Sequence, residues 1–279
     1  MALTVAGTRL TQANQAAQLA QRAQSLQGLL RLWSIVDVTD LAGTIDTFAQ
    51  AAALLAGEGF DQSAATAANY YSLFRRVEGI GTIVVPRAPR PPADYLVGQL
   101  RGSALKGIID GRKAGMSTSA AKANGFVRVA GALVKLVLGG GRMTIITATG
   151  NDRQALGWAR MTSGDPCTFC RTLASRGPVY KSEKSADFQA HDHDACMPEP
   201  VYRGDPVNLG VAQQSATYLE EYRTAQEWAR ASGTMSAGTS NNALNNYRRW
   251  LDNGSPSPSQ GANDGAAGAG SDGGNPGVN

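Results

Sequence analysis

Cysteine and histidine are scarce in this chain of 279 residues, which contains three cysteines and two histidines. A small, odd number of cysteines argues against a disulfide framework and favours assembly in a reducing cytoplasm. The first residues show no charged segment followed by an apolar run, so we expect no secretory signal. The longest apolar run, Val129 to Leu138, is interrupted by Lys135 and is too short to span a bilayer. We therefore expect no membrane association.

The sequence also lacks the common nucleotide-binding and catalytic motifs. It contains no phosphate-binding Gly-x-x-x-x-Gly-Lys-Ser/Thr loop, no His-Glu-x-x-His and no Gly-x-Ser-x-Gly. A Ser/His/Asp hydrolase needs a histidine that acts as base, and both histidines lie in one candidate metal-binding block. We predict no cofactor-binding loop and assign no catalytic residue. A nucleophile at Ser103 or Ser117, or a Cys167–His191 pair, stays open without a motif that supports it.

The few cysteines and histidines are concentrated in one block, the segments 164–170 (Gly-Asp-Pro-Cys-Thr-Phe-Cys) and 191–196 (His-Asp-His-Asp-Ala-Cys). Two thiolates separated by two residues can bind one ion from a tight turn, and Gly-Asp-Pro favours such a turn. A second ligand pair, about twenty residues on, can complete a tetrahedron around Zn²⁺. The candidate ligands are Cys167, Cys170, Cys196 and one of His191 and His193. Four protein ligands leave no open position, so we predict a structural zinc rather than a catalytic one.

Other interpretations of this block stay open. The cysteines can be small buried thiols beside polar loop histidines, or the Cys-x-x-Cys can be a redox dithiol, although such a motif typically opens a helix after a strand. Asp187, Asp192 and Asp194 can bind a hard cation, but carboxylates in turns more commonly face solvent. Residues at i and i+2 share a face only in extended chain, so we expect only one of the two histidines to bind.

Apolar residues recur at helical spacing over much of the chain. One predicted helix, 11–36, carries the stripe Leu19, Leu26, Leu29, Leu30 and Trp33. A second helix is predicted from Asp40 to a stop at 57–59, a third from Ser63, a fourth from Ala93, and a fifth from Ser117 to a stop at 139–141. Three further helices are predicted at 142–156, 212–231 and 240–252. On the helix from Ala93 we expect Tyr95, Leu96, Leu100, Leu105, Ile108 and Ile109 to be buried. Short strands are predicted at 83–85, 158–161, 179–180 and 201–202.

These elements predict an α+β fold with a predominantly helical N-terminal two thirds and a small β/metal-knuckle module near 157–203. C-terminal helices and a disordered tail follow, because the tail has almost no large apolar residue to bury. The predicted domains are a helical N-terminal region, a basic helical middle, the Cys/His module with short strands, the C-terminal helices and the tail. Their boundaries are 1–78, 79–156, 157–210, 211–252 and 253–279.

The positive charge is concentrated in the middle of the chain. Residues 72–136 carry eleven basic and three acidic side chains, whereas residues 1–71 carry three and five. A basic segment can meet nucleic acid or an acidic protein surface. Since no exposed aromatic residues are interleaved with these charges, we favour solvated helix faces.

The Cys/His block also carries a resemblance to a known family. The segments 158–180, 191–196 and 200–202 resemble the C-terminal signature of MuF-like phage minor head proteins, in particular those of actinobacterial phages. These proteins typically show Cys-x-x-Cys, a Leu-x-x-x-Gly segment and a closing His-x-x-Cys-x-Cys. Cys167 and Cys170 match the first pair, and the segment 173–177 matches the middle. The specific match covers residues 155–205.

The closing element departs from the family pattern. Aligning His191 on the family histidine places Asp194 at the first closing cysteine and Cys196 at the second. Aligning His193 instead places Cys196 at the first cysteine and Pro198 at the second. The resemblance therefore leaves the ligating histidine open and makes Asp194 an alternative ligand.

The resemblance implies a minor capsid protein that assists procapsid assembly and genome packaging or ejection. Its implied partners are the portal protein, the major capsid and scaffold proteins, and packaged DNA. Its implied location is the host cytoplasm during assembly and then the virion head. The family domain resembles an ADP-ribosyltransferase-like α+β fold, but no matching catalytic residues occur here, so we do not expect an enzyme.

Two alternatives to the head-protein role stay open. Related actinobacterial phage proteins are often labelled capsid maturation proteases, so a hydrolase of that kind is the first. A zinc-knuckle protein that binds nucleic acid through the basic middle is the second.

Overall fold

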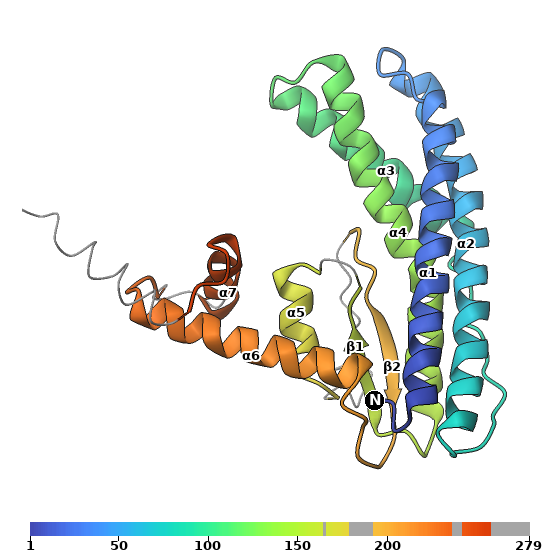
Figure 1. The fold of residues 1–279 in the computed structure, drawn as a ribbon. Coiled ribbons are helices and arrows are strands. Elements are labelled where there is room, and N and C mark those ends of the chain that lie inside the picture. The colour runs from blue at the N-terminus through green and yellow to red at the C-terminus, as the bar shows by residue number, and fades with distance from the viewer. Residues whose placement is uncertain (164–165, 179–191, 236–241, 258–279) are drawn as a thin grey trace, which may run out of the picture. The chain divides into compact units, whose positions relative to one another are not determined.

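The computed structural model describes residues 1–163, 166–178, 192–235 and 242–257, and Figure 1 shows its elements. Within these ranges the chain forms seven α-helices, one short 3-10 helix and two strands, which confirms the predicted α+β, mostly helical fold class. The chain divides into two compact units, residues 1–163 with 178–212, and residues 164–177 with 213–279. The finer domain boundaries predicted from the sequence stay a prediction.

Four long helices dominate the first unit. They are α1 (Val5–Leu32), α2 (Leu41–Val77), α3 (Ala93–Lys113) and α4 (Thr118–Asn151), and the short 3-10 helix η1 (Trp33–Ile35) extends α1. Thr4, Asp40 and Ser117 cap three of them, because each side-chain oxygen accepts a hydrogen bond from a backbone N–H of the first turn. Both α1 and α4 pack along α2, and α3 packs against α2 and α4.

Helices α2 and α4 continue through the glycines at which the sequence predicts stops. The predicted breaks at 57–59 and 139–141 are wrong, because these glycines serve helix packing rather than termination. A Cβ on Gly140 would lie 2.1 Å from the backbone oxygen of Phe60, and one on Gly59 would lie 2.8 Å from a methyl group of Val137. Because glycine has no Cβ, the backbones of α2 and α4 can approach each other closely at these positions. The helix predicted for 142–156 is the C-terminal part of α4, which ends at Asn151.

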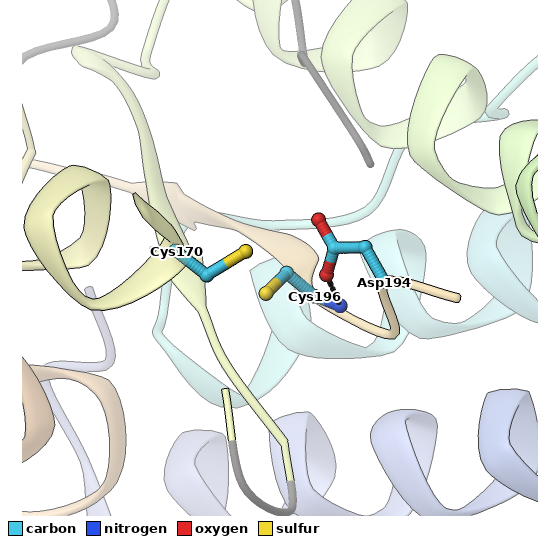
Figure 2. Close-up of side chains that lie close together, drawn as sticks. All are labelled: Cys170, Asp194 and Cys196. Carbon is cyan, nitrogen blue, oxygen red and sulfur yellow. Dashed lines mark hydrogen bonds between the residues drawn. The ribbon is translucent and has the colours of Figure 1, made fainter. Parts of the chain in front are cut away.

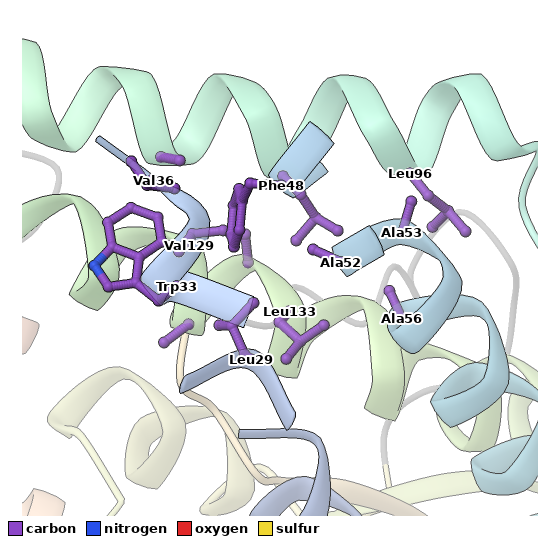
Figure 3. Packing of buried hydrophobic residues seen from close by; sticks show 14 of the residues in the cluster. Leu29, Trp33, Val36, Phe48, Ala52, Ala53, Ala56, Leu96, Val129 and Leu133 are labelled. Carbon is purple, nitrogen blue, oxygen red and sulfur yellow. The ribbon is translucent and has the colours of Figure 1, made fainter. Parts of the chain in front are cut away.

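The largest apolar core lies among α1, α2, α3 and α4. Figure 3 shows part of it, including Leu29 of α1, Trp33 of η1, Phe48 of α2 and Leu133 of α4. The Trp33 and Phe48 rings meet edge to face with centroids 5.0 Å apart, a geometry that adds to the area they bury. On α3, Leu96, Leu100 and Ile108 are buried as predicted, whereas Tyr95 and Ile109 are 50% and 42% exposed and contradict the prediction.

The N-terminal half of α1 buries the polar side chains of Thr8, Thr11, Asn14 and Gln18. In the apolar stripe predicted over residues 19–33, Leu29 and Trp33 are buried as predicted, whereas Leu30 is 60% exposed and contradicts the prediction. The Gln18 amide donates to the backbone oxygen of Ser63 at 3.0 Å and accepts from the Ser63 hydroxyl at 2.6 Å. Hydrogen bonds to α2 thus replace apolar contact on this half of α1, and hydropathy patterns do not detect such a face.

Two strands form a small antiparallel sheet in the first unit. β1 (Gly157–Met161) pairs with β2 (Met197–Val201), with Gly157 opposite Val201 and Met161 opposite Met197. β1 confirms the strand predicted at 158–161, whereas β2 lies earlier than the predicted 201–202. The strand predicted at 83–85 is wrong, because these residues pair with no strand, and the backbone oxygen of Ile83 accepts a hydrogen bond from the Ser72 hydroxyl of α2 instead. The strand predicted at 179–180 lies outside the described residues.

Helix α4 is long and apolar enough to cross a membrane by length and composition. The most apolar part of this helix is 72% buried inside the protein, and the core helix of a soluble protein can have the same length and composition. That apolar character is explained by the core that α4 shares with α2 and α3.

The second unit contains α5 (Thr168–Ala174), most of α6 (Gly210–Ala231) and α7 (Asn242–Asp252). A compact aromatic core joins α6 to α7 through Trp228, Tyr247 and Trp250. The helices predicted at 212–231 and 240–252 are confirmed. Most of the predicted tail, residues 258–279, lies outside the described residues.

Candidate metal centre

The Cys-x-x-Cys motif begins helix α5 instead of lying in an isolated turn. Cys167 is the N-cap, with φ −61° and ψ 159°, and Cys170 lies in the first turn. Cys167 is exposed and Cys170 is buried. The predicted turn is therefore a helix N-terminus that follows β1 in the chain, the local context also typical of redox dithiols.

Helix α5 is held on α6 by the side chain of Arg171. Its guanidinium lies 3.1 Å from the carboxylate of Glu221 and 5.5 Å from the centre of the Tyr218 ring. The Tyr247 hydroxyl of α7 donates to the same carboxylate. Burial, with the bond to Glu221, raises the pKa of Tyr247 far above its ordinary value. These contacts fix the helix that carries Cys170.

The other cysteine, Cys196, lies in a segment that enters β2 and is held by buried Arg142 of α4. The Arg142 guanidinium donates to the backbone oxygen of Asp194 at 2.6 Å and to that of Cys196 at 2.9 Å. The Asp194 carboxylate accepts from the backbone N–H of Cys196 at 2.7 Å. One arginine and one tight turn therefore set the position of both residues.

The electrostatics of this segment favour an ionised Asp194. Burial opposes ionisation, but the hydrogen bond from Cys196 and the positive charges of Arg142 and Arg160 outweigh it, so the pKa of Asp194 lies below its ordinary value. A guanidinium nitrogen of Arg160, on β1, lies 3.5 Å from the carboxylate, and both side chains are almost completely buried. Asp194 is thus an anionic donor held inside the protein.

Cys170, Asp194 and Cys196 form a group that can hold a metal ion, because their ligand atoms all lie within 4.8 Å of one another (Figure 2). Thiolate sulfur and carboxylate oxygen are donors that Zn²⁺ accepts in tetrahedral sites. Cys170 and Cys196 are buried, and Asp194 is at most 9% exposed, so an ion in this group would be shielded from water. The donor chemistry of the residues present therefore fits a zinc ion.

The structure places the other predicted ligands differently. Cys167 and His193 do not belong to the group of three, and His191 lies outside the described residues. His193 is exposed and has a φ of 69°, and its Nε2 atom lies against Gly131 of α4, 2.9 Å from where a Cβ would be. The full set Cys167, Cys170, His191, His193 and Cys196 stays a prediction.

The two arginines of this site could not be identified from the sequence. Arg142 and Arg160 lie on α4 and β1, more than thirty residues before Asp194, and no motif links them to the block. Asp194 was indicated in two ways, as one of three aspartates that can bind a hard cation and through the alignment to the MuF-like signature. A buried arginine that binds backbone oxygens leaves no local sequence pattern.

Taken together, these features define a mostly helical protein with a small sheet and a buried group of two thiols and one carboxylate. Residues 5–225 match the family model described as VG15 protein, which covers well over half of the 279 residues. The chain belongs to this family of phage virion-associated proteins, so it is a phage protein related to the virion. No curated protein and no solved structure matches the chain.

Proposed function

We propose that this chain is a minor capsid protein of the MuF-like kind that acts in head morphogenesis. The family match carries the proposal, because it spans α1 to α6 and assigns the chain to phage virion-associated proteins. The MuF-like signature around Cys167 and Cys170 supports the finer role. In this role the protein associates with the portal, contacts the major capsid and scaffold proteins, and assists procapsid assembly and genome packaging or ejection.

The test of this role is a phage whose copy of this polypeptide is removed by a nonsense mutation and restored from a plasmid. We expect heads purified without it to be absent, unfilled or unable to eject DNA, and normal heads to contain it in few copies that co-purify with portal. Normal, filled and infectious heads that lack the polypeptide would contradict the proposal.

We further propose that Cys170, Asp194 and Cys196 bind a structural zinc. The group's burial and donor chemistry support it, and so does the pKa of Asp194, which favours the anionic ligand. Such an ion would cross-link Cys170 to Asp194 and Cys196. The chemistry that zinc supplies here is a cross-link between donors rather than a reactive water.

The zinc proposal is tested by the metal content of the purified full chain. We expect about one zinc per chain, lost in Cys170→Ser and in Cys196→Ser together with part of the thermal stability. Exposed Cys167 provides the comparison: loss of zinc in Cys167→Ser supports it as fourth ligand, and retention limits the site to the group of three. A chain without zinc in which Cys170 and Cys196 form a disulfide would overturn the proposal.

Most of the basic side chains of residues 72–136 make contacts within the chain. Seven of the eleven basic side chains form an ion pair with a carboxylate of the same chain or donate to one of its backbone oxygens: Arg75, Arg90, Arg101, Lys106, Arg112, Lys122 and Arg128. This use of the charges favours the head role over nucleic-acid binding. Steeply salt-dependent retention of the protein on DNA would reverse that order.

The protease alternative is tested by co-expression with the major capsid protein. The head role predicts an uncut capsid protein and co-purification with portal. Cleavage of the capsid protein that disappears on Ser117→Ala, Ser103→Ala or Cys167→Ser would establish a protease instead.

A further inference from the structure

A proline-rich segment connects α2 to α3 and has a nearly fixed backbone. It reads Val85-Pro86-Arg87-Ala88-Pro89-Arg90-Pro91-Pro92, and we name it the proline strap (85–92). Each proline holds φ near about −65°, and each residue before a proline is restricted to extended conformations. Only Arg87 escapes both restrictions. Pro92, with φ −55° and ψ 148°, has the geometry of a polyproline II helix.

Burial along the proline strap repeats every three residues, as it does in a polyproline II helix with one side against a surface. Val85, Ala88 and Pro91 are half-buried, whereas the residues that follow each of them, Pro86, Pro89 and Pro92, are exposed. Three prolines therefore form one edge that faces solvent. The sequence pattern Pro-x-x-Pro-x-x-Pro and the exposure pattern coincide.

The inner side of the strap is anchored to the helices. The backbone N–H of Ala88 donates to the Thr144 hydroxyl of α4 at 2.9 Å, and Val85 packs against the apolar cluster around Phe74. Arg90 forms an ion pair with Asp61 of α2. These contacts hold the strap in place, so a partner that binds its outer edge would not have to order it first.

The outer side carries a positive charge and an exposed apolar residue. Arg87 is exposed and lines, with Val84 and Asn69, a groove of about 500 Å³ between the strap and α2. Val84 is 94% exposed, an unusual position for a large apolar side chain. Among the described residues Arg87 makes no ion pair, in contrast to Arg90.

We propose that the proline strap is a docking ridge for another virion protein that presents a groove lined by aromatic side chains. Aromatic grooves bind the preformed ridges of Pro-x-x-Pro segments because little conformational entropy is lost. A carboxylate at the edge of that groove would pair with Arg87 and set the direction of binding. The inference rests on the virion association of the family and not on the head-morphogenesis role.

Proline rings point to a protein partner rather than to nucleic acid. They offer apolar faces and no N–H donors, whereas phosphate backbones are bound by clusters of cations and amides. With Arg90 paired to Asp61, Arg87 is the cation that the strap leaves for a partner. One charge beside three apolar rings suits a groove of tryptophan or tyrosine with an acidic rim.

The experiment uses virions that carry a photo-crosslinking amino acid at position 84 of the full chain. After irradiation, we expect crosslinks to a peptide of a different virion protein that contains tryptophan or tyrosine near an acidic residue. Crosslinks only to DNA, only to a second copy of this chain, or to no other molecule would overturn the proposal. Because whole virions are irradiated, the result does not depend on the chain being a head protein.

Two variants make the test specific to the outer edge. Pro86→Ala with Pro89→Ala removes two outward rings, whereas Pro91→Ala changes an inward ring of the same strap and serves as control. We expect the double variant to lower the crosslink yield about tenfold and the control less than about twofold, with the thermal unfolding midpoint of each measured to verify folding. Equal crosslink yields from the folded double variant and the folded control would overturn the proposal that the strap is a docking ridge.

Discussion

The two ends of the first unit's helix bundle are stabilised by different interactions. At one end, Leu29, Trp33, Phe48 and Leu133 pack in an apolar core. At the other end, near the sheet, the side chains of Tyr71 and Arg75 on α2 and of Tyr202, directly after β2, meet around the carboxylate of Asp152, the C-cap residue of α4. When one apolar side chain is shortened, its neighbours relax and recover part of the lost packing energy. A buried polar group that loses its partner has no such compensation, so the free energy of folding bears the full cost of removing that group from water.

The candidate metal segment is likewise positioned by polar contacts. Arg142 binds the backbone oxygens of Asp194 and Cys196, and Arg160 lies beside the carboxylate of Asp194. Directional bonds of this kind fix the positions of individual donor and acceptor atoms, which a group of metal ligands requires.

The largest effect is expected at Asp152. Its carboxylate binds the Arg75 guanidinium at 2.7 Å and accepts from the hydroxyls of Tyr71 and Tyr202 at 3.1 and 3.2 Å. Asp152→Ala leaves a buried cation unpaired, so we expect the free energy of unfolding to fall by about 3–5 kcal/mol, measured by urea denaturation.

An exposed ion pair provides the matched control for Asp152. Asp46 lies 2.5 Å from Arg101, but both side chains are about half exposed or more. We expect Asp46→Ala to change stability by about 0–1 kcal/mol, because solvent screens the pair. Equal effects at Asp46 and Asp152 would contradict the proposed difference between surface and buried charges.

The second prediction concerns the close approach of α2 and α4 at Gly140. Gly140→Ala would place a methyl group against the backbone of Phe60, so we expect a loss of about 3 kcal/mol, at the upper end of overpacking effects. Gly150, on the same helix, has no neighbouring atom within 4 Å of where a Cβ would be, and Gly150→Ala should stabilise by about 0.5–1 kcal/mol. Thermal unfolding of the two variants measures both effects, and a neutral Gly140→Ala would sink the packing explanation.

The third prediction is a loss of stability at alkaline pH from the polar end. Burial raises the pKa of Tyr71 to about 12 from the ordinary 10.0, and burial also raises the pKa of Tyr70 and Tyr202. Because the pKa of Tyr71 is higher in the folded than in the unfolded state, its neutral ring stabilises the folded protein fully below pH 10.0. This contribution is lost as the pH rises from 10.0 to about 12. For Tyr71 alone it amounts to about 2–3 kcal/mol.

Urea unfolding at pH 8 and pH 11 measures this dependence. Tyr71→Phe should show a smaller loss of stability between the two pH values than the unmodified chain, because the ring can no longer ionise. Tyr95→Phe, at a half-exposed ring of α3, should keep the full loss. A pH dependence that is the same in Tyr71→Phe as in the unmodified chain would contradict the assignment.

The smallest expected effect lies at the apolar end, at the N-cap of α2. The Asp40 carboxylate accepts from the backbone N–H of Gly43 at 3.0 Å. We expect Asp40→Ala to lower the unfolding free energy by about 1 kcal/mol and Asp40→Asn, which keeps the accepting oxygen, by much less. If thermal unfolding shows equal losses in both variants, the cap is not the cause.

Much of the secondary structure followed from local sequence. The caps at Asp40 and Ser117, the start of α3 after Pro92 and strand β1 were predicted from residues within a few positions of each element. Local predictions failed where glycine served packing instead of termination, at Gly59 and Gly140. In both places the partner that explains the glycine lies on another helix.

The candidate metal site, too, was predictable from the sequence only in part. Residue type and short spacing are enough to show that the sulfur donors lie in one block, that prolines restrict the backbone of the strap and that helices dominate. Long-range contacts, which the sequence does not reveal, bring Cys170 and Cys196 to Asp194, place Arg142 and Arg160 beside Asp194, and bury threonine and glutamine side chains of α1. Those outcomes depend on contacts between residues far apart in the chain, where a buried polar group is stable only if a partner of matching geometry reaches it.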